Sequence, residues 1–113
     1  MGTNAYAELG YGVVVDEDIA NKIVEEVFDE DDEDAYFTEY VYDIDELEYI
    51  SSGADGCERF VVCLKNFTHG TDWGQFLEIK SLPIPEDLSA LDKFCDKHNL
   101  KKEYAWQLGA YLG

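Results

Sequence analysis

Residues 4–28 read NAYAELGYGVVVDEDIANKIVEEVF, and the hydrophobic period changes in the middle of this stretch. In its first half, small and apolar residues occupy every second position, which is typical of a half-buried β-strand. In its second half, apolar residues recur every three or four positions, which is typical of an amphipathic helix. Asp16 lies at the junction, where its carboxylate can accept a hydrogen bond from a free backbone amide and cap the helix. The stretch therefore predicts a strand over 4–15 followed directly by a helix over 17–28.

Two glycines, Gly10 and Gly12, interrupt the predicted strand. A glycine inside a strand commonly marks a β-bulge or a place where another backbone comes close. A Gly-Tyr-Gly sequence also occurs in phosphate loops, but the full spacing of such a motif is missing here. The acids that follow would moreover repel a phosphate. We therefore expect both glycines to mark a bulge or a close backbone contact.

The segment 35–45 has two interpretations. Its aromatic and β-branched residues favour a strand, whereas the spacing of its apolar residues fits a helical stripe and its acids weaken a strand. We expect a short helix around 35–42. The aromatic side chains either pack into the core, as aromatic stripes mostly do, or stay exposed as a contact surface rimmed by acids. These aromatic residues are Tyr36, Phe37, Tyr40 and Tyr42.

The second half of the chain alternates as in a β-meander, and a helix and a last strand follow. Turn signals lie at 53–56 and 68–74. Pro85 has the place of a first-turn proline, and Asn99 that of a left-handed residue that ends the helix. The second strand of the meander is apolar on both faces, so we expect it in the centre of the sheet. The expected strands cover 46–52, 60–65, 76–82 and 103–112.

These elements predict one small α+β domain over residues 1–113, in the order β-α-(α)-β-β-β-α-β. We expect a mixed or antiparallel sheet of about four to five strands, with the helices packed on one side. A hydrophobic content of 46% argues against disorder. No apolar run approaches the roughly 20 residues of a membrane helix, and the N-terminus lacks a secretory pattern. The odd number of cysteines fits a reducing compartment, so we expect the cytoplasm, or the host cytoplasm for a viral protein.

Negative charge is concentrated between Asp16 and Glu48. This segment holds 16 acids and one base, Lys22, which gives it a net charge of −15 out of −18 for the whole chain. Such a surface repels nucleic acid and anionic membranes and attracts a basic partner. Direct binding of nucleic acid is further disfavoured because the one cluster of bases is small. That cluster consists of Lys93, Lys97, Lys101 and Lys102.

Few residues are candidates for catalysis or metal binding. Cys95 and His98 lie three residues apart on a predicted helix, which makes half a zinc site without a second close pair. The run of six acids starts like a calcium-binding loop, but Asp34 lies where glycine is needed and Tyr40 where a bidentate glutamate is needed. We therefore expect no catalytic residue, no cofactor and no built metal site, with weak divalent binding left open. The other candidate nucleophiles and imidazoles are Cys57, Cys63 and His69.

In size and charge the chain resembles the small acidic phage proteins that mimic DNA and block restriction or CRISPR enzymes. The resemblance covers the composition and the segment 16–48, because such mimics share no common fold or motif. B-form DNA carries one charge per about 1.7 Å of its axis, so 15 charges correspond to about 25 Å of duplex. The resemblance implies a non-enzymatic inhibitor of the anti-CRISPR or anti-restriction class that occludes the basic groove of a nucleic-acid-binding protein.

The alternative is an acidic adaptor or assembly protein that docks a basic protein unrelated to nucleic acid. A small enzyme or metal binder, and a structural subunit whose acids only solvate it, are two further hypotheses. For the inhibitor, we expect the partner to contact carboxylates and aromatic side chains of the acidic segment. These residues are Glu17, Asp18, Glu25, Glu26, Asp29, Glu30, Asp31, Asp32, Glu33, Asp34, Tyr36, Phe37, Glu39, Tyr40, Tyr42, Asp43, Asp45 and Glu46.

Overall fold

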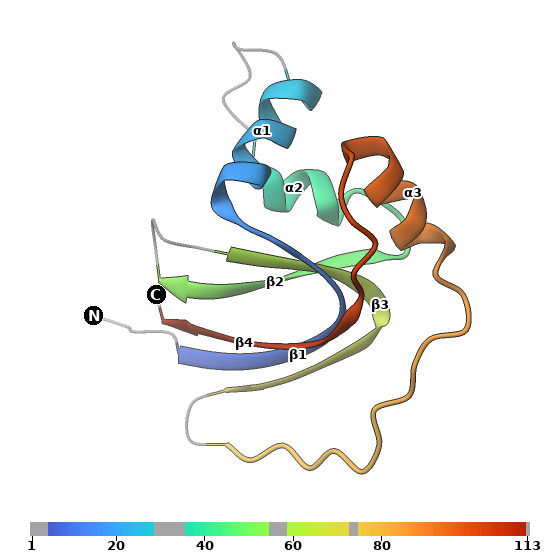
Figure 1. Cartoon of the computed structure of the whole chain (residues 1–113). Helices are drawn as coiled ribbons and strands as arrows, with labels where there is room; N and C mark the ends of the chain where they lie inside the picture. The colour runs from blue at the N-terminus through green and yellow to red at the C-terminus, as the bar shows by residue number, and fades with distance from the viewer. Residues whose placement is uncertain (1–4, 29–35, 55–58, 73–74, 113) are drawn as a thin grey trace.

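The computed structural model describes residues 5–28, 36–54, 59–72 and 75–112. Over these residues it contains a four-stranded mixed sheet and three helices, and all three helices lie on one side of the sheet (Figure 1). The predicted α+β class is therefore confirmed. In chain order the elements are β1 (Ala5–Val15), α1 (Glu17–Val27), α2 (Phe37–Tyr42), β2 (Leu47–Ala54), β3 (Arg59–Asp72), α3 (Ser89–His98) and β4 (Ala105–Leu112).

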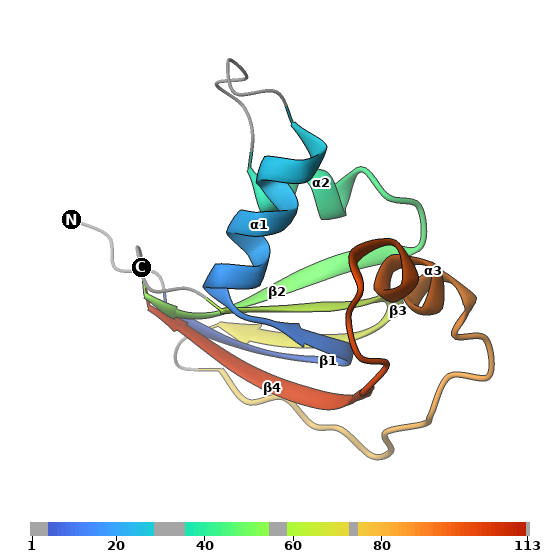
Figure 2. The same cartoon turned by 45° about the horizontal axis from the view of Figure 1, so that its top comes forward.

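The strands pair in a closed ring in the order β1-β3-β2-β4. β1 is antiparallel to both β3 and β4, and β2 is antiparallel to β3. β2 is parallel to β4 at its end, where Gly53 pairs with Tyr111. The ring brings the first and last strands together, since β1 pairs with β4 from Ala5 opposite Leu112 to Gly12 opposite Ala105. Figure 2 shows the strands curving beneath the helices.

The two glycines of β1 lie where the strands approach one another most closely. A Cβ atom on Gly12 would stand 1.8 Å from the carbonyl oxygen of Val62, and one on Gly10 would stand 2.5 Å from Cδ1 of Ile50. The register of β1 against β3 also shifts between these glycines. Both expectations, a bulge and a close backbone contact, are confirmed.

The main hydrophobic core lies between the sheet and the helices. It combines alternate residues of the strands with the apolar stripes of α1, α2 and α3. A second, smaller cluster of Ile50, Val61 and Cys63 fills the ring of strands, where Ile50 reaches the glycine positions of both β1 and β4. The buried residues of the main core are Tyr11, Val13, Val15, Ala20, Ile23, Phe37, Val41, Leu47, Val62, Leu64, Leu91, Phe94 and Cys95.

The ends of two helices agree with the sequence patterns. The Oδ1 atom of Asp16 accepts a hydrogen bond of 3.0 Å from the backbone amide of Ile19, so Asp16 caps α1 as predicted. Asn99 ends α3 in the left-handed region, with φ 56° and ψ 42°. The short helix expected around 35–42 is present as α2.

The prediction for residues 68–82 was wrong. The expected turn at 68–74 is in its larger part a continuation of β3, because residues 68–72 pair with Tyr6–Gly10 of β1 and thereby satisfy their backbone groups. The strand expected at 76–82 does not form. Within the described part of the chain, residues 75–88 belong to no strand or helix, and the sheet has four strands, within the four to five expected.

Helix α3 begins at Ser89, four residues after the predicted first-turn proline. The carboxylate of Asp87 accepts hydrogen bonds from the backbone amide of Ser89 at 3.0 Å and from its hydroxyl at 2.7 Å. The first backbone amides of a helix have no acceptor within the helix, and Asp87 supplies one to the amide of Ser89. This local turn therefore favours a helix that begins at Ser89. Pro85 is buried in the preceding extended segment instead.

We predict that Gly12→Ala lowers the free energy of unfolding by about 2 kcal/mol or more, because its Cβ meets backbone that cannot move aside. Gly70→Ala is the matched control, since its Cβ would meet the flexible side chain of Glu8 at 3.3 Å. Urea denaturation followed by circular dichroism measures both. Equal losses in the two variants would contradict the close contact at Gly12.

Candidate functional site

Helix α1 presents carboxylates on the side away from the core. Its buried residues, Ala20 and Ile23, face the sheet, and its acids are all exposed. The first two acids suit their position, because the N-terminal end of a helix favours negative charge. The last two, Glu25 and Glu26, lie near the C-terminal end, where the helix dipole opposes negative charge and the last turn holds no base. The exposed acids of α1 are Glu17, Asp18, Glu25 and Glu26.

Helix α2 and the connection to β2 carry a second group of exposed acids next to α1. The two helices contact each other through their apolar sides. Glu46 has a φ of 71°, a left-handed conformation that favours glycine over other residues. Glu48, the first acid inside β2, is only half-buried. The exposed acids of this group are Glu39, Asp43, Asp45 and Glu46.

The described acids of the segment 16–48 stay free of ion pairs with the protein's own bases. Residues 16–28 and 36–48 hold ten acids and one base, a net charge of −9. Nine of these ten acids are exposed. The ion pairs within the described residues, Lys80–Glu78 and Lys102–Asp96, involve none of them. The predicted contact residues Asp29, Glu30, Asp31, Asp32, Glu33 and Asp34 lie outside the described residues.

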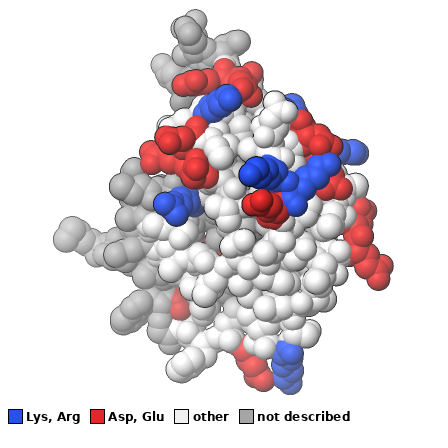
Figure 3. All heavy atoms as spheres, viewed as in Figure 1, with Lys and Arg blue, Asp and Glu red and all other residues white. Residues whose placement is uncertain are grey.

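Charge is distributed unevenly over the molecular surface. In Figure 3 the acidic side chains lie mainly over the helices in the upper part of the view, with basic side chains between them. The lower part of the same face is largely uncharged, apart from a few charged side chains at its edges. The helical side of the molecule therefore carries most of the visible charge.

The structure divides the predicted aromatic contacts into two pairs. Tyr36 and Tyr42 are 61% and 62% exposed and lie at the two ends of α2. Phe37 is buried, with its ring 5.2 Å from that of Phe60, and Tyr40 is half-buried. Tyr36 and Tyr42 are thus exposed, as a contact surface requires, whereas Phe37 and Tyr40 pack toward the core. A partner can reach Tyr36 and Tyr42, whereas Phe37 serves the core.

Tyr40 joins α2 to the end of α3. Its hydroxyl lies 2.8 Å from Nε2 of His98, and its ring packs edge-on against that of Phe28. Nδ1 of His98 is buried and has no hydrogen-bond partner among the residues that the structure describes. Burial lowers the pKa of His98, Lys97 lowers it further, and Glu26 opposes this shift. Sequence patterns could not reveal this contact, because its partners lie 58 residues apart.

A pocket of about 420 Å³ lies between α3 and the connection from α2 to β2. Lys93 and Lys97 line it from α3, while Asp45 and Glu46 line it from the connection. Its apolar lining comes from Ile44, Leu47, Ala90 and Phe94. Three of the predicted contact residues, Tyr40, Asp45 and Glu46, therefore share this pocket with bases of the small lysine cluster.

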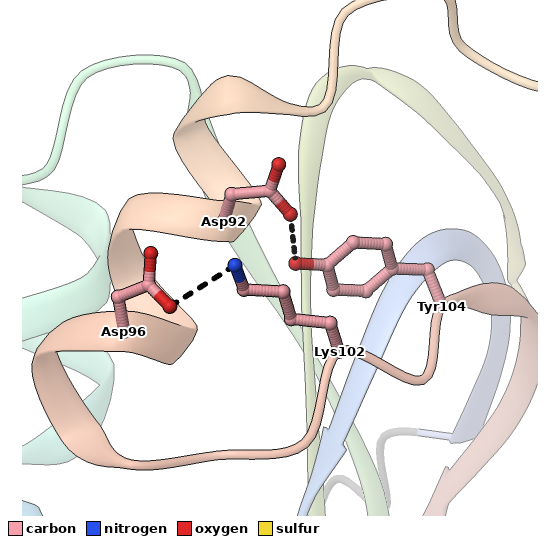
Figure 4. Close-up of polar contacts among 4 residues, drawn as sticks. All are labelled: Asp92, Asp96, Lys102 and Tyr104. Carbon is pink, nitrogen blue, oxygen red and sulfur yellow. Dashed lines mark hydrogen bonds and ion pairs between the residues drawn. The ribbon is translucent and has the colours of Figure 1, made fainter.

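Two acids outside the acidic segment have internal partners instead (Figure 4). The Tyr104 hydroxyl donates a hydrogen bond of 2.6 Å to Asp92, and the Lys102 ammonium lies 3.0 Å from Asp96. Burial and the bond to Asp92 raise the pKa of Tyr104, so it keeps its proton. These contacts hold the start of β4 against α3. Asp92 and Asp96 thus hold parts of the fold together, whereas the acids of α1 and α2 form no ion pair within the described residues.

The candidate nucleophiles Cys63 and Cys95 are both buried. Within the described residues, no group of three or more His, Cys, Asp or Glu side chains is placed to hold a metal ion. Cys63 and Cys95 are free and buried, and burial raises the pKa of the Cys63 thiol to about 12. A thiol with such a pKa is a poor nucleophile at neutral pH. Cys57 lies outside the described residues.

No helix in the described part of the chain is both long enough and apolar enough to span a membrane. Comparisons of the chain with protein-family models, with curated proteins and with solved structures find no match. No relative therefore assigns a role to any residue. A function therefore has to be inferred from the exposed carboxylates of α1 and α2.

We predict that acid destabilises the fold through His98. Its pKa in the folded chain lies below the ordinary 6.5, so the unfolded chain takes up the proton first as the pH falls. The stability that neutral His98 contributes is present above pH 6.5 and is lost as the pH falls through the folded pKa.

Urea denaturation between pH 7 and pH 5 measures this effect in the wild type and in His98→Phe. The stability difference between the two proteins should shrink toward pH 5, while protonation of the many carboxylates cancels in the comparison. An NMR titration of the imidazole reports its pKa directly. A stability difference that does not change with pH, or an imidazole pKa above 6.5, would refute the prediction.

Proposed function

We propose that this protein is a non-enzymatic inhibitor that occupies the basic groove of a nucleic-acid-binding protein in place of nucleic acid, as DNA mimics of the anti-CRISPR or anti-restriction class do. The observation that supports it most is the state of the described acids of 16–48. Nine are exposed, and none forms an ion pair with a base among the described residues. Unpaired carboxylates are available to the lysines and arginines that such a groove presents to phosphate.

Three of these acids occupy positions that weaken the fold. Glu25 and Glu26 oppose the dipole of α1, which costs about 0.3–1 kcal/mol for each charge near a helix end. Glu46 keeps a left-handed backbone that glycine or asparagine would adopt more easily. Charges that lower stability and have no internal partner fit a role in binding better than a role in folding.

The described part of this surface has a suitable charge density. Nine net charges correspond to about 15 Å of duplex, at about 1.7 Å per charge. The 11 residues of α1 span about 16 Å, at about 1.5 Å per residue. α1 itself carries −3 of this charge, and the remaining −6 lies on Asp16 and on residues 36–48. A groove that holds a short stretch of duplex therefore meets a similar number of charges only across α1, α2 and the connection to β2 together.

Binding in this mechanism begins with electrostatic attraction. The net charge of −18 steers the protein toward a positively charged groove and raises the association rate, which salt then lowers. Tyr36 and Tyr42 lie exposed at the ends of α2 and supply contact area between the acids. Tyrosine is among the residues that contribute most to binding energy at protein interfaces.

We predict that Glu25→Lys with Glu26→Lys weakens partner binding at least tenfold, an effect of about 1.4 kcal/mol. The partner is first captured from lysate at low salt and identified by mass, and affinity is then measured at several salt concentrations. The control, Glu86→Lys with Glu103→Lys, changes the net charge equally at exposed acids outside the acidic segment.

The control variant should bind nearly as tightly as the wild type. Equal losses in both variants, or an affinity that does not change with salt, would count against a localised acidic surface. Capture of a basic protein that handles no nucleic acid would instead favour the adaptor hypothesis.

We predict that the aromatic residues of α2 separate by role. Tyr36→Ala with Tyr42→Ala should weaken binding and leave the free energy of unfolding nearly unchanged, because both side chains are mostly exposed. Phe37→Ala should lower the free energy of unfolding by about 3–5 kcal/mol, because it empties part of the core. Calorimetry of binding and urea denaturation measure the two effects. Tyrosine variants that bind as the wild type does would remove α2 from the contact surface.

A further inference from the structure

The segment 75–88 exposes large apolar side chains on the side of the molecule opposite the helices. Figures 1 and 2 both show it running from the end of β3 around to α3, away from the helical layer. Phe76 is fully exposed, and Ile84 is 70% exposed. Leu77 and Leu82 are also exposed, as is Leu108 on the neighbouring β4. Clustered apolar exposure of this kind commonly marks an interaction surface.

The segment is held in place at its C-terminal half. The indole nitrogen of Trp106 donates a hydrogen bond of 3.2 Å to the carbonyl oxygen of Pro83. Pro85 is buried, and the two prolines fix φ and keep the residues before them extended. An extended backbone fixed at one end loses less conformational entropy when it pairs with another strand.

Residues 76–82 have the sequence of a strand without a strand partner. Their residues alternate as in a β-strand, yet in the described structure they join no sheet. Among the described residues β3 also has a free edge nearby, because β2 pairs with it over 59–64 and the later residues of β3 pair there with β1 alone. A strand sequence that is exposed and unpaired is a template for pairing with another chain.

We propose that residues 76–82 pair antiparallel with the same residues of a second copy of this chain, about a two-fold axis at Ile79. Antiparallel pairing at this centre sets Glu78 of each copy opposite Lys80 of the other. It also sets Phe76 opposite Leu82 at both ends. The sequence FLEIKSL is thus self-complementary in charge and in apolar character, as a two-fold interface requires.

The Glu78 and Lys80 side chains are available for this exchange. They lie 4.0 Å apart within one chain and are 81% and 87% exposed, so the internal pair is weak. In the dimer each meets its opposite charge across the strand pair, where direct neighbours interact.

The charge of residues 75–85 permits self-association through this face. Residues 75–85 hold one acid and one base and are neutral, whereas the chain as a whole carries −18. The acidic helices lie on the opposite side of the sheet, so pairing through this segment keeps the two acidic surfaces apart (Figure 1). The contact is short, so we expect a weak dimer whose population depends on concentration.

Sedimentation velocity of the full chain, from low to high micromolar concentration at physiological ionic strength, tests the proposal. The wild type should shift from monomer toward dimer. Glu78→Lys or Lys80→Glu alone should weaken the dimer at least tenfold, because each places like charges opposite one another. The double variant, Glu78→Lys with Lys80→Glu, should restore it. Ile79→Pro should abolish it by removing a backbone donor at the centre.

A wild type that stays monomeric throughout would overturn the proposal. So would a dimer that survives both single exchanges, or a double exchange that fails to restore it. Circular dichroism of each variant checks that the substitution leaves the fold intact. The result is independent of partner binding, because it depends on residues outside the acidic segment.

Discussion

The close contact between Gly12 and the backbone of β3 is the constraint on which this structure depends. No side chain fits between Gly12 and the carbonyl oxygen of Val62, so β1 approaches β3 more closely than a strand with side chains could. This approach allows four strands to close a ring that Ile50 and Cys63 nearly fill. With so little room inside the ring, the larger core forms on its outer, helical side. The three helices are therefore gathered into one layer.

The single layer of helices determines where the acidic side chains lie. α1 follows β1 after a single residue, and α2 packs against α1, so their acids share one side of the sheet. The acids of α3 behave differently, since Asp92 and Asp96 bond Tyr104 and Lys102. The same fold thus contains carboxylates that hold elements together and carboxylates left to the solvent. That contrast is the reason why we propose the acidic helices as the surface that a basic partner contacts.

Local patterns sufficed where the determinants are local. The change of period at residue 16, the cap by Asp16 and the left-handed Asn99 all depend on neighbours in sequence, and all were predicted correctly. The two wrong predictions concern segments whose structure depends on pairing with residues far away in the sequence. Residues 68–72 have the composition of a turn but lie in β3 because β1 pairs with them. Residues 76–82 have the pattern of a strand but join no sheet in the described part of the chain. The contact of Tyr40 with His98 left no sequence signal at all.

The pairing of Ala5 with Leu112 has a consequence for how the molecule is made. Of the four described strands, β1 is synthesised first and β4 last, and because the two are neighbours the ring cannot close until β4 has emerged from the ribosome. β1 pairs with both β3 and β4, and β4 is synthesised long after β1. Contacts between residues so distant in sequence form slowly. During that wait the acids of the nascent chain repel one another and other nascent chains, which keeps an incomplete sheet in solution.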